Sequence, residues 1–384
     1  MQKDSKDKAL TSTERRCFLK LSAGFGITAA LVALSRNALG AEAESDQIGR
    51  KETELKAAAE HTMILGTAYA PGVSRSYPIM QLDFKENIQN ASLGKIYVQL
   101  EPAGQVGAEG TLARNVQNAI IQAGQCSISN FSPFVPEVDL INLPYWCSEN
   151  QKFVNLVTSD AWKKKIHPKI EARGFKPLWY PCIDPRTLAM GQGLKEKITT
   201  PEQMRGIKFR IPNSTILQRL YRQLGAHPIL VEWVEAANAI RLGSVDALDP
   251  SIGALYVFGF KNLLSQITFA DIIQDAQMYF CNLEWFSRLP QPLKTSIDFA
   301  SEMTMRQNHA KVPSARAHAE MQMTSAGVKL NRLSSDEKAQ WKEKVGAHLA
   351  IWDDVKKQLA GSLSEFDKFQ EAADTPGNYH IPEK

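Results

Sequence analysis

The sequence is poor in the residues that metal and thiol chemistry needs. It has five cysteines and seven histidines among 384 residues, with no CxxC pair and no histidines at metal-ligand spacing. Structural zinc sites and dithiol redox centres depend on such spacings. The sequence therefore predicts no metal site and no cofactor.

Recognisable catalytic motifs are also missing. The chain has no Gly-x-Ser-x-Gly elbow, no His-Glu-x-x-His helix and no phosphate-binding loop, and its histidines do not cluster. Each of these motifs places a nucleophile, a base or a cation where a reaction needs it. Their absence argues against an enzyme built on one of them.

The first 41 residues have the order of an export signal. Thr13–Lys20, with two adjacent arginines, resembles the twin-arginine pattern, and an apolar run over Leu21–Leu34 and the small-residue stretch Ala38–Ala41 follow it. The run is shorter than the roughly 20 residues that span a bilayer. We therefore expect residues 1–41 to be a twin-arginine-type signal peptide and the mature chain to be periplasmic; an N-terminal membrane anchor is the alternative. No later stretch is apolar enough to cross a membrane.

The excess of positive charge belongs to this leader. Residues 1–41 hold seven Lys and Arg against three Asp and Glu, which leaves 38 of each kind in the remaining chain. Binding of nucleic acid needs a basic face or stripe, so no nucleic-acid partner is expected. Roughly 340 mature residues exceed what one core fills, and two lobes are expected.

Four cysteines follow the leader, and their state is tied to the export route. A twin-arginine substrate folds in the reducing cytoplasm before export, so its fold should not depend on disulfides. Free or structural thiols are therefore favoured, and disulfides remain the alternative. The residues concerned are Cys126, Cys147, Cys182 and Cys281.

Hydrophobic periodicity divides the mature chain into strands and helices. The polar stretch 42–60 is expected to be a linker or a capping helix. Strands are expected at Met63–Thr67, Lys95–Leu100 and Lys176–Tyr180, and helices at Ile79–Ala91, Leu112–Ala123, Trp162–Ala172, Leu293–Ala326 and Ser335–Leu359. Such alternation is what an α/β fold with covered sheets requires.

The most informative stretch is Arg205–Asp249. Apolar residues at positions 207, 209 and 211 alternate with Lys208 and Arg210, which is the period-two pattern of a strand with one buried face. Arg210 then stands at the carboxyl end of the strand, where ligands of open α/β sheets bind. A guanidinium offers a planar fork of donors that matches a carboxylate. The pattern predicts a carboxylate-binding cleft; the alternative is that Arg210 pairs with an acidic residue of its own lobe.

The same stretch carries a family resemblance. GIKFRIPNS, LGAHPILVEW and EAANAIRLGSVDALD, between Gly206 and Asp249, resemble the core signature of the solute receptors of TRAP (tripartite ATP-independent periplasmic) transporters, the DctP-like family. Further matching blocks are SLGKIYVQLEPAGQVG at Ser92–Gly107, LPYW at Leu143–Trp146, ITTPEQM just before the signature and LEWFSRLPQPLK at Leu283–Lys294. The blocks stand in the family's order and at compatible spacing, so the resemblance covers most of the chain after the leader.

The resemblance implies ligand-binding roles for particular residues. Arg210 matches the arginine that clamps the ligand's carboxylate, and Arg186 resembles a second ligand arginine, although at a longer spacing than in several relatives. Trp233 matches an aromatic residue placed against the ligand, with core packing as the alternative. Asn213 either contacts the ligand or caps the following helix. The other residues placed near the cleft, with a loop or surface position as the alternative, are Thr67 or Tyr69, Glu109, Asn130 and Ser132.

One position departs from the family pattern. Many relatives carry an acid followed by an asparagine that bonds the ligand, where this chain has Asp249 and Pro250. Proline has neither an N–H nor an amide side chain to offer. That contact is therefore expected to be lost or to pass to Asp249 or Ser251, and the substrate to differ from those of sugar-acid receptors.

The fold implied by the resemblance is α/β and similar to type II periplasmic binding proteins. Two α/β lobes would surround a central ligand cleft, joined by hinge crossings and long helices. The expected boundaries are 61–183 with about 276–312 for lobe I, and 184–275 with about 313–384 for lobe II.

The implied function is that of a solute receptor. Its lobes would close on a small organic acid and deliver it to the subunits of a TRAP membrane permease, which an ion gradient drives. The receptor would be a monomer or a homodimer. The alternatives are a periplasmic enzyme acting on a small carboxylate and a ligand sensor for a signalling receptor.

Overall fold

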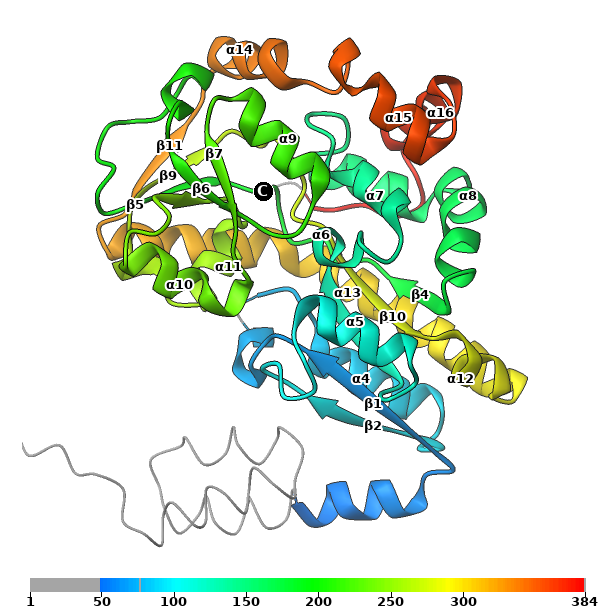
Figure 1. The fold of residues 1–384 in the computed structure, drawn as a ribbon. Coiled ribbons are helices and arrows are strands. Elements are labelled where there is room, and N and C mark those ends of the chain that lie inside the picture. The colour runs from blue at the N-terminus through cyan, green and yellow to red at the C-terminus, as the bar shows by residue number, and fades with distance from the viewer. Residues whose placement is uncertain (1–48, 76, 383–384) are drawn as a thin grey trace, which may run out of the picture.

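The computed structural model describes residues 49–75 and 77–382 (Figure 1). The predicted signal peptide, residues 1–41, lies outside the described residues. Residues 49–58 form a helix. The carboxylate of Glu52 in this helix lies 2.7 Å from Lys85 Nζ and accepts a hydrogen bond from the Tyr97 hydroxyl at 2.8 Å.

The first sheet has five strands in the order β2-β1-β3-β10-β4. β1 pairs in parallel with β2 and β3, whereas β10 lies antiparallel between β3 and β4. β10 comes from late in the chain, after the chain has passed through five of the six strands of the second sheet. The strands are β1 His61–Thr67, β2 Ile96–Glu101, β3 Ala123–Ser127, β4 Phe175–Trp179 and β10 Gln277–Asn282.

The second sheet has six strands in the order β11-β9-β5-β8-β6-β7. β6 pairs in parallel with both β7 and β8, and its carboxyl end is the one that carries Arg210. This sheet lies apart from the first in Figure 1. The strands are β5 Leu188–Gly191, β6 Lys208–Ile211, β7 His227–Leu230, β8 Ala247–Leu248, β9 Leu264–Phe269 and β11 Lys329–Arg332.

Helices connect the strands and cover the sheets. The α-helices are α4 Gln81–Ala91, α5 Glu109–Gln117, α6 Ile128–Phe131, α7 Asn150–Thr158, α8 Asp160–Glu171, α9 Thr215–Gln223, α10 Trp233–Arg241, α11 Ile252–Val257, α12 Leu283–Arg288, α13 Gln291–Ser325, α14 Ser335–Val345, α15 Asp353–Ala360 and α16 Leu363–Asp374. Short 3₁₀ helices are η1 Pro71–Arg75, η2 Pro136–Asn142, η3 Pro201–Met204, η4 Phe260–Asn262 and η5 Ala350–Trp352. No helix in the described part of the chain has the length and apolar character needed to cross a membrane.

Two sheets with their own helices make two lobes, as the sequence predicted. We call the part built on the five-stranded sheet the first lobe and the part built on the six-stranded sheet the second lobe. The long helix α13 packs against α4 and β4 of the first lobe and against α11 and β11 of the second (Figure 1). The last helices, α15 and α16, pack on η2, α7 and α8. The residue boundaries of the two lobes stay a prediction.

A buried asparagine of α13 fixes the chain segment that links the sheets. Asn308 Oδ1 accepts a hydrogen bond from Cys182 N at 2.9 Å, and its Nδ2 donates to Cys182 O at 3.0 Å. Cys182 lies between β4 and β5, on the connection from the first sheet to the second. The side chain amide thus replaces the strand partner that this backbone lacks.

One predicted helix ends earlier than the periodicity indicated. The sequence predicted a helix over Leu112–Ala123, but α5 ends at Gln117 and Ala123 already belongs to β3. Ala119 has a positive φ of 57°, which turns the chain out of the helix, and Ile120 is 61% exposed. The prediction was wrong because apolar residues of the turn and of β3 happened to continue the helical spacing.

The helix predicted over Ser335–Leu359 is two helices. α14 ends at Val345 beside Gly346, and α15 begins at Asp353. Trp341 and Trp352 are fully buried on the two sides of the break, and Trp352 Nε1 donates to the carbonyl oxygen of Val345 at 2.8 Å. Burial of both indoles bends the chain at a point where the local sequence pattern predicted a continuous helix.

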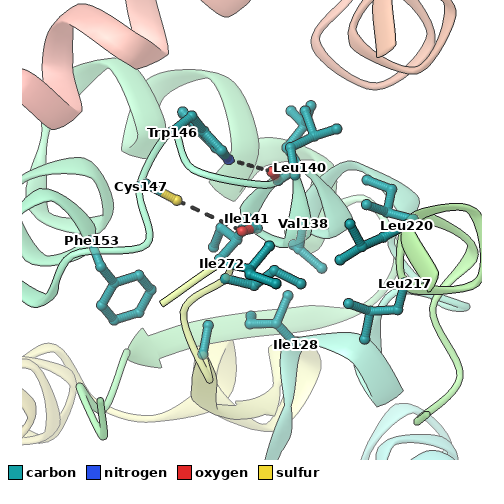
Figure 2. Packing of buried hydrophobic residues seen from close by; sticks show 14 of the residues in the cluster. Ile128, Val138, Leu140, Ile141, Trp146, Cys147, Phe153, Leu217, Leu220 and Ile272 are labelled. Atoms are coloured by element: carbon teal, nitrogen blue, oxygen red, sulfur yellow. Dashed lines mark hydrogen bonds between the residues drawn. The ribbon is translucent and has the colours of Figure 1, made fainter. Parts of the chain in front are cut away.

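The largest apolar cluster joins helices and loops of both lobes. Figure 2 shows part of it, with Ile128 and Val138 packed against Leu217 and Leu220 of α9. Trp146 Nε1 donates to the carbonyl oxygen of Leu140 at 2.8 Å. The four cysteines after the leader are all buried and free, as favoured by the sequence: Cys126, Cys147, Cys182 and Cys281.

Candidate ligand-binding site

A pocket between the two lobes contains most of the predicted site. It encloses about 510 Å³ of atom-free space, part of it open to solvent. Gln125 on β3 and Gln277 on β10 contribute from the first sheet, and Arg210 contributes from the end of β6 in the second. Six of the predicted ligand residues line the pocket: Tyr69, Glu109, Asn130, Arg186, Arg210 and Trp233.

Arg210 is a buried cation with unused hydrogen-bonding capacity. Its side chain is 2% exposed, and its Nε donates to the carbonyl oxygen of Val231 at 2.8 Å. Its Nη2 has no hydrogen-bond partner, and no ion pair among the described residues includes it. Burial lowers the pKa of Arg210 to about 10, against the opposing effect of Asp249. The guanidinium stays charged at neutral pH, and a buried unpaired charge is costly unless an anion joins it.

Arg186, in contrast, is already paired with two carboxylates of the protein. Its Nη1 lies 3.0 Å from Asp249 Oδ1 and its Nη2 lies 3.0 Å from Asp275 Oδ1. Burial works to lower the pKa of Arg186, but the carboxylates of Asp275 and Asp249 outweigh it, so the pKa is raised. Arg186 lines the pocket, yet two carboxylates of the protein compensate its charge.

Asp249 lies behind the pocket wall. It is fully buried, does not line the pocket, and accepts a hydrogen bond from the Tyr221 hydroxyl at 3.2 Å. Burial raises its pKa, and Arg186 opposes that rise. Pro250 does line the pocket, and its carbonyl oxygen accepts from Thr187 Oγ1 at 2.8 Å. Asp249 therefore orients Arg186, and the neighbouring proline presents an apolar surface to the pocket.

Glu109 connects the two lobes across the pocket. It is the first residue of α5, has a positive φ of 53° and is 6% exposed. Its Oε1 accepts a hydrogen bond from Trp233 N at 2.8 Å. Trp233 begins α10, whose N-terminus carries partial positive charge. A carboxylate of the first lobe thus caps a helix of the second.

Asn130 and Asn213 also meet across the lobes. Asn213 N donates to Asn130 Oδ1 at 3.4 Å. Asn130 lines the pocket, whereas Asn213 is exposed and lies outside the lining. The cap of α9 is Ser214 and not Asn213, because Ser214 Oγ accepts from Leu217 N at 3.1 Å.

Two further predicted residues lie one layer away from the pocket. Thr67 is fully buried; its Oγ1 donates to Gln81 Oε1 at 2.6 Å and accepts from Tyr69 N at 3.0 Å. Ser132 Oγ donates to Ser129 O at 3.0 Å. Neither lines the pocket. Thr67 positions Tyr69, which does line it, while Ser132 stabilises the short helix α6.

Sequence reasoning missed four polar residues of the lining: Gln125, Ser127, Asp275 and Gln277. Gln125 Nε2 donates to Gln277 Oε1 at 2.7 Å across β3 and β10. Asp275 accepts from Ser251 N at 3.1 Å in addition to its contact with Arg186. A polar residue within an otherwise apolar strand, as at Gln125 and Gln277, was the one available signal.

The arrangement can hold an anion, but it offers no nucleophile with a base. Cys126 lines the pocket, and burial raises the pKa of its thiol, so it is protonated at neutral pH. Tyr69 is buried, and burial raises the pKa of its phenol. It is therefore a neutral hydrogen-bonding group. No group of three or more metal-ligating side chains occurs among the described residues.

Two α/β lobes around a buried, unpaired guanidinium define a solute-binding protein of the type II periplasmic class. The chain belongs to the family described as bacterial extracellular solute-binding protein, family 7 (DctP), which matches residues 73–356. The resemblance to TRAP solute receptors is thereby confirmed. Among characterised relatives, the C4-dicarboxylate-binding periplasmic protein DctP of Rhodobacter capsulatus is 21% identical over 262 residues, which are 68% of this chain and 77% of that one.

Solved structures show the same fold. A TRAP periplasmic solute-binding protein of Sulfurospirillum deleyianum with bound succinate is similar at a TM-score of 0.72 and 19% identity, over 83% of this chain and 100% of that one. The sugar acid binding protein of Advenella mimigardefordensis in complex with galactonate reaches a TM-score of 0.73 and 19% identity, over 82% and 98% of the two chains. The predicted α/β fold with two lobes is thus confirmed.

Proposed function

We propose that this protein is a periplasmic receptor that binds a small organic acid between its lobes and delivers it to a TRAP membrane permease. The observation that supports it is the Nη2 of Arg210, buried without a partner beside the pocket. A ligand carboxylate would supply the missing hydrogen bond and the missing negative charge. Relatives and structural neighbours that bind succinate, galactonate and C4-dicarboxylates support the same class of ligand.

Binding is proposed to select the closed arrangement of the lobes. Arg210 holds the carboxylate in the second lobe, while Tyr69, Gln125 and Gln277 present polar groups from the first. A ligand favours the closed form only through its extra contacts there. The hydrogen bond from Trp233 N to Glu109 and that from Asn213 N to Asn130 form between the lobes in the same arrangement.

The receptor role is proposed in preference to catalysis because the pocket holds no activated nucleophile. Purified protein should be incubated with candidate organic acids while melting temperature and ligand composition are followed. A raised melting temperature with chemically unchanged ligand supports the receptor, because a ligand that binds the native state stabilises it. Conversion of an acid into a product contradicts it and favours a periplasmic enzyme.

Delivery to a permease is tested in the cell. Deleting the receptor should abolish uptake of the bound acid, and collapsing the ion gradient should do the same. A ligand sensor for a signalling receptor would leave uptake intact and alter gene expression instead. The N-terminal region is proposed to be a twin-arginine signal, and blocking that export route should leave the protein in the cytoplasm. Light scattering distinguishes a monomer from a homodimer.

A further inference from the structure

The cationic side chains of the pocket differ in whether carboxylates of the protein already pair with them. Two cationic side chains line it among the described residues, Arg186 and Arg210. Arg186 is engaged by Asp249 and Asp275, each at 3.0 Å. Arg210 alone has an unpartnered Nη group. The pocket therefore offers one unpaired cation for one carboxylate.

The remaining charged side chains of the lining are negative. Glu109 and Asp275 line the pocket, and Asp249 lies directly behind Arg186. When all are ionised, these three carboxylates outnumber Arg186 and Arg210 by one. Glu109 accepts a single backbone N–H, and no ion pair among the described residues includes it. A second ligand carboxylate would find no free cation and would lie near like charges, an arrangement that penalises binding strongly in a desolvated site.

The first lobe instead offers neutral hydrogen-bonding groups. Gln125 and Gln277 form a buried pair of amides on adjacent strands, and Gln125 Oε1 has no partner. Tyr69, a further neutral polar residue, also lines the pocket. A ligand hydroxyl matches these groups because it donates one hydrogen bond and accepts others, so it can complement an amide of either orientation. An aliphatic group there would leave the buried amide oxygen unsatisfied.

We propose that the ligand carries one carboxylate and at least one hydroxyl, and that the pocket discriminates against a second carboxylate. Arg210 takes the carboxylate, the amides of Gln125 and Gln277 take the hydroxyl, and Glu109 and Asp275 repel a further anion. This inference rests on the proposed receptor function. It separates the protein from its neighbour with bound succinate, which accommodates two carboxylates.

The test measures dissociation constants by calorimetry for three matched sets of acids. The first set is butanoate, 4-hydroxybutanoate and succinate; the second is gluconate and glucarate; the third is benzoate, 4-hydroxybenzoate and terephthalate. In whichever set fits the pocket, the hydroxylated monocarboxylate should bind at least about tenfold more tightly than the dicarboxylate. It should also bind more tightly than the plain acid, because unsatisfied polar groups discriminate strongly. A dicarboxylate that binds as tightly as its matched hydroxy acid overturns the inference.

Two variants separate this inference from the receptor function. Glu109→Gln removes a negative charge and keeps an oxygen for Trp233 N, so the ratio between dicarboxylate and hydroxy acid should shrink by at least about threefold. An unchanged ratio argues against the role of Glu109, and circular dichroism checks that the variant folds. Arg210→Ala should weaken every acid. If no acid binds the wild type, the receptor function itself fails. If Arg210→Ala binds all of them as well as the wild type does, the carboxylate binds elsewhere and this inference fails while the receptor function stands.

Discussion

The guanidinium carbon of Arg210 lies 5.4 Å from the centre of the indole ring of Trp233. The ring also stacks on Phe260, with centroids 5.3 Å apart, and meets Phe258 edge-on at 5.0 Å. These contacts hold the indole as a wall beside the cation. A cation over an aromatic face gains electrostatic stabilisation without losing its charge. Arg210 is thus kept oriented, with its outer nitrogen left available for an anion.

Replacing Arg210 with alanine should severely weaken binding of the organic acid. Loss of one partner from a desolvated charge pair costs about 2–5 kcal/mol, which is roughly 30-fold to several thousand-fold in affinity. Arg210→Lys should also weaken binding because an ammonium cannot reproduce the planar fork of donors. Calorimetry with the tightest acid measures both effects. Arg219→Ala, on the exposed face of α9, is the matched control, and a loss below about threefold in Arg210→Ala would show that the carboxylate binds elsewhere.

Asn308→Ala should destabilise the connection between the lobes. The substitution leaves Cys182 N and Cys182 O without their side-chain partners in a fully buried setting. An unsatisfied buried group costs about 1–3 kcal/mol, so the free energy of unfolding should fall by at least that amount. Urea unfolding measures the loss. Asn238→Ala removes an exposed asparagine of α10 and should change stability little; equal effects of the two variants would contradict the role of Asn308.

Substitutions of Asp139 can separate the stabilising effect of its hydrogen bonds from the effect of its buried negative charge. Its carboxylate accepts from Ser214 Oγ at 2.8 Å and from Asn142 Nδ2 at 2.7 Å, and Ile216 N at the start of α9 lies 3.4 Å away. Burial raises its pKa, against these hydrogen bonds. Asp139→Ala should lower the free energy of unfolding by about 1–3 kcal/mol because buried donors lose their acceptor.

The isosteric variant is the informative comparison. Asp139→Asn keeps an acceptor oxygen for Ser214 while removing the buried charge, so it should destabilise less than Asp139→Ala at neutral pH. Denaturant unfolding of both variants at pH 7 checks the order. If the asparagine variant were the less stable of the two, the negative charge itself would be what stabilises the N-terminus of α9.

Stability should fall on acidification because buried histidines are neutral in the folded protein. Burial is the main reason that the pKa values of His167 and His309 are lowered to about 4, and at His309 the charge of Arg306 contributes to that value. An unfolded chain has a histidine pKa of about 6.5, so below that pH it binds more protons than the native state. The contribution of these two histidines to the free energy of unfolding is therefore fully present above about pH 6.5 and is lost as the pH falls toward 4.

The variant His309→Leu isolates one of these titrations. Its unfolding free energy should gain about 2–3 kcal/mol relative to the wild type between pH 7.5 and 4.5, since the leucine has no proton to bind. The Nε2 of His309 has no hydrogen-bond partner, so no bond from that atom is lost. His380→Leu, at an exposed position, controls for loss of a histidine. Parallel pH profiles for His309→Leu and the wild type would refute a buried neutral His309.

The sequence predicted secondary structure correctly where the pattern of neighbouring side chains determines it. Alternation along residues 207–211 predicted β6, and its position before a helix placed Arg210 at the carboxyl end of a strand. The helix pattern from Leu293 to Ala326 matches α13 within two residues at its start and one at its end. The end of α5 was mispredicted because a turn at Ala119 ends the helix while the apolar spacing continues, and the end of α14 because tertiary packing of Trp341 and Trp352 breaks the helix there.

What only the tertiary structure decided is which side chains share the pocket. Gln125 and Gln277 are separated by 152 positions, and they meet because β10 returns to pair with β3. Period-two spacing tells on which face of a strand a residue lies, but not which strand will lie beside it. The sequence identified both Arg186 and Arg210 as ligand candidates, with Arg210 as the carboxylate clamp. Only the fold gave two carboxylates to Arg186 and left Arg210 unpaired, because charge compensation depends on neighbours in space.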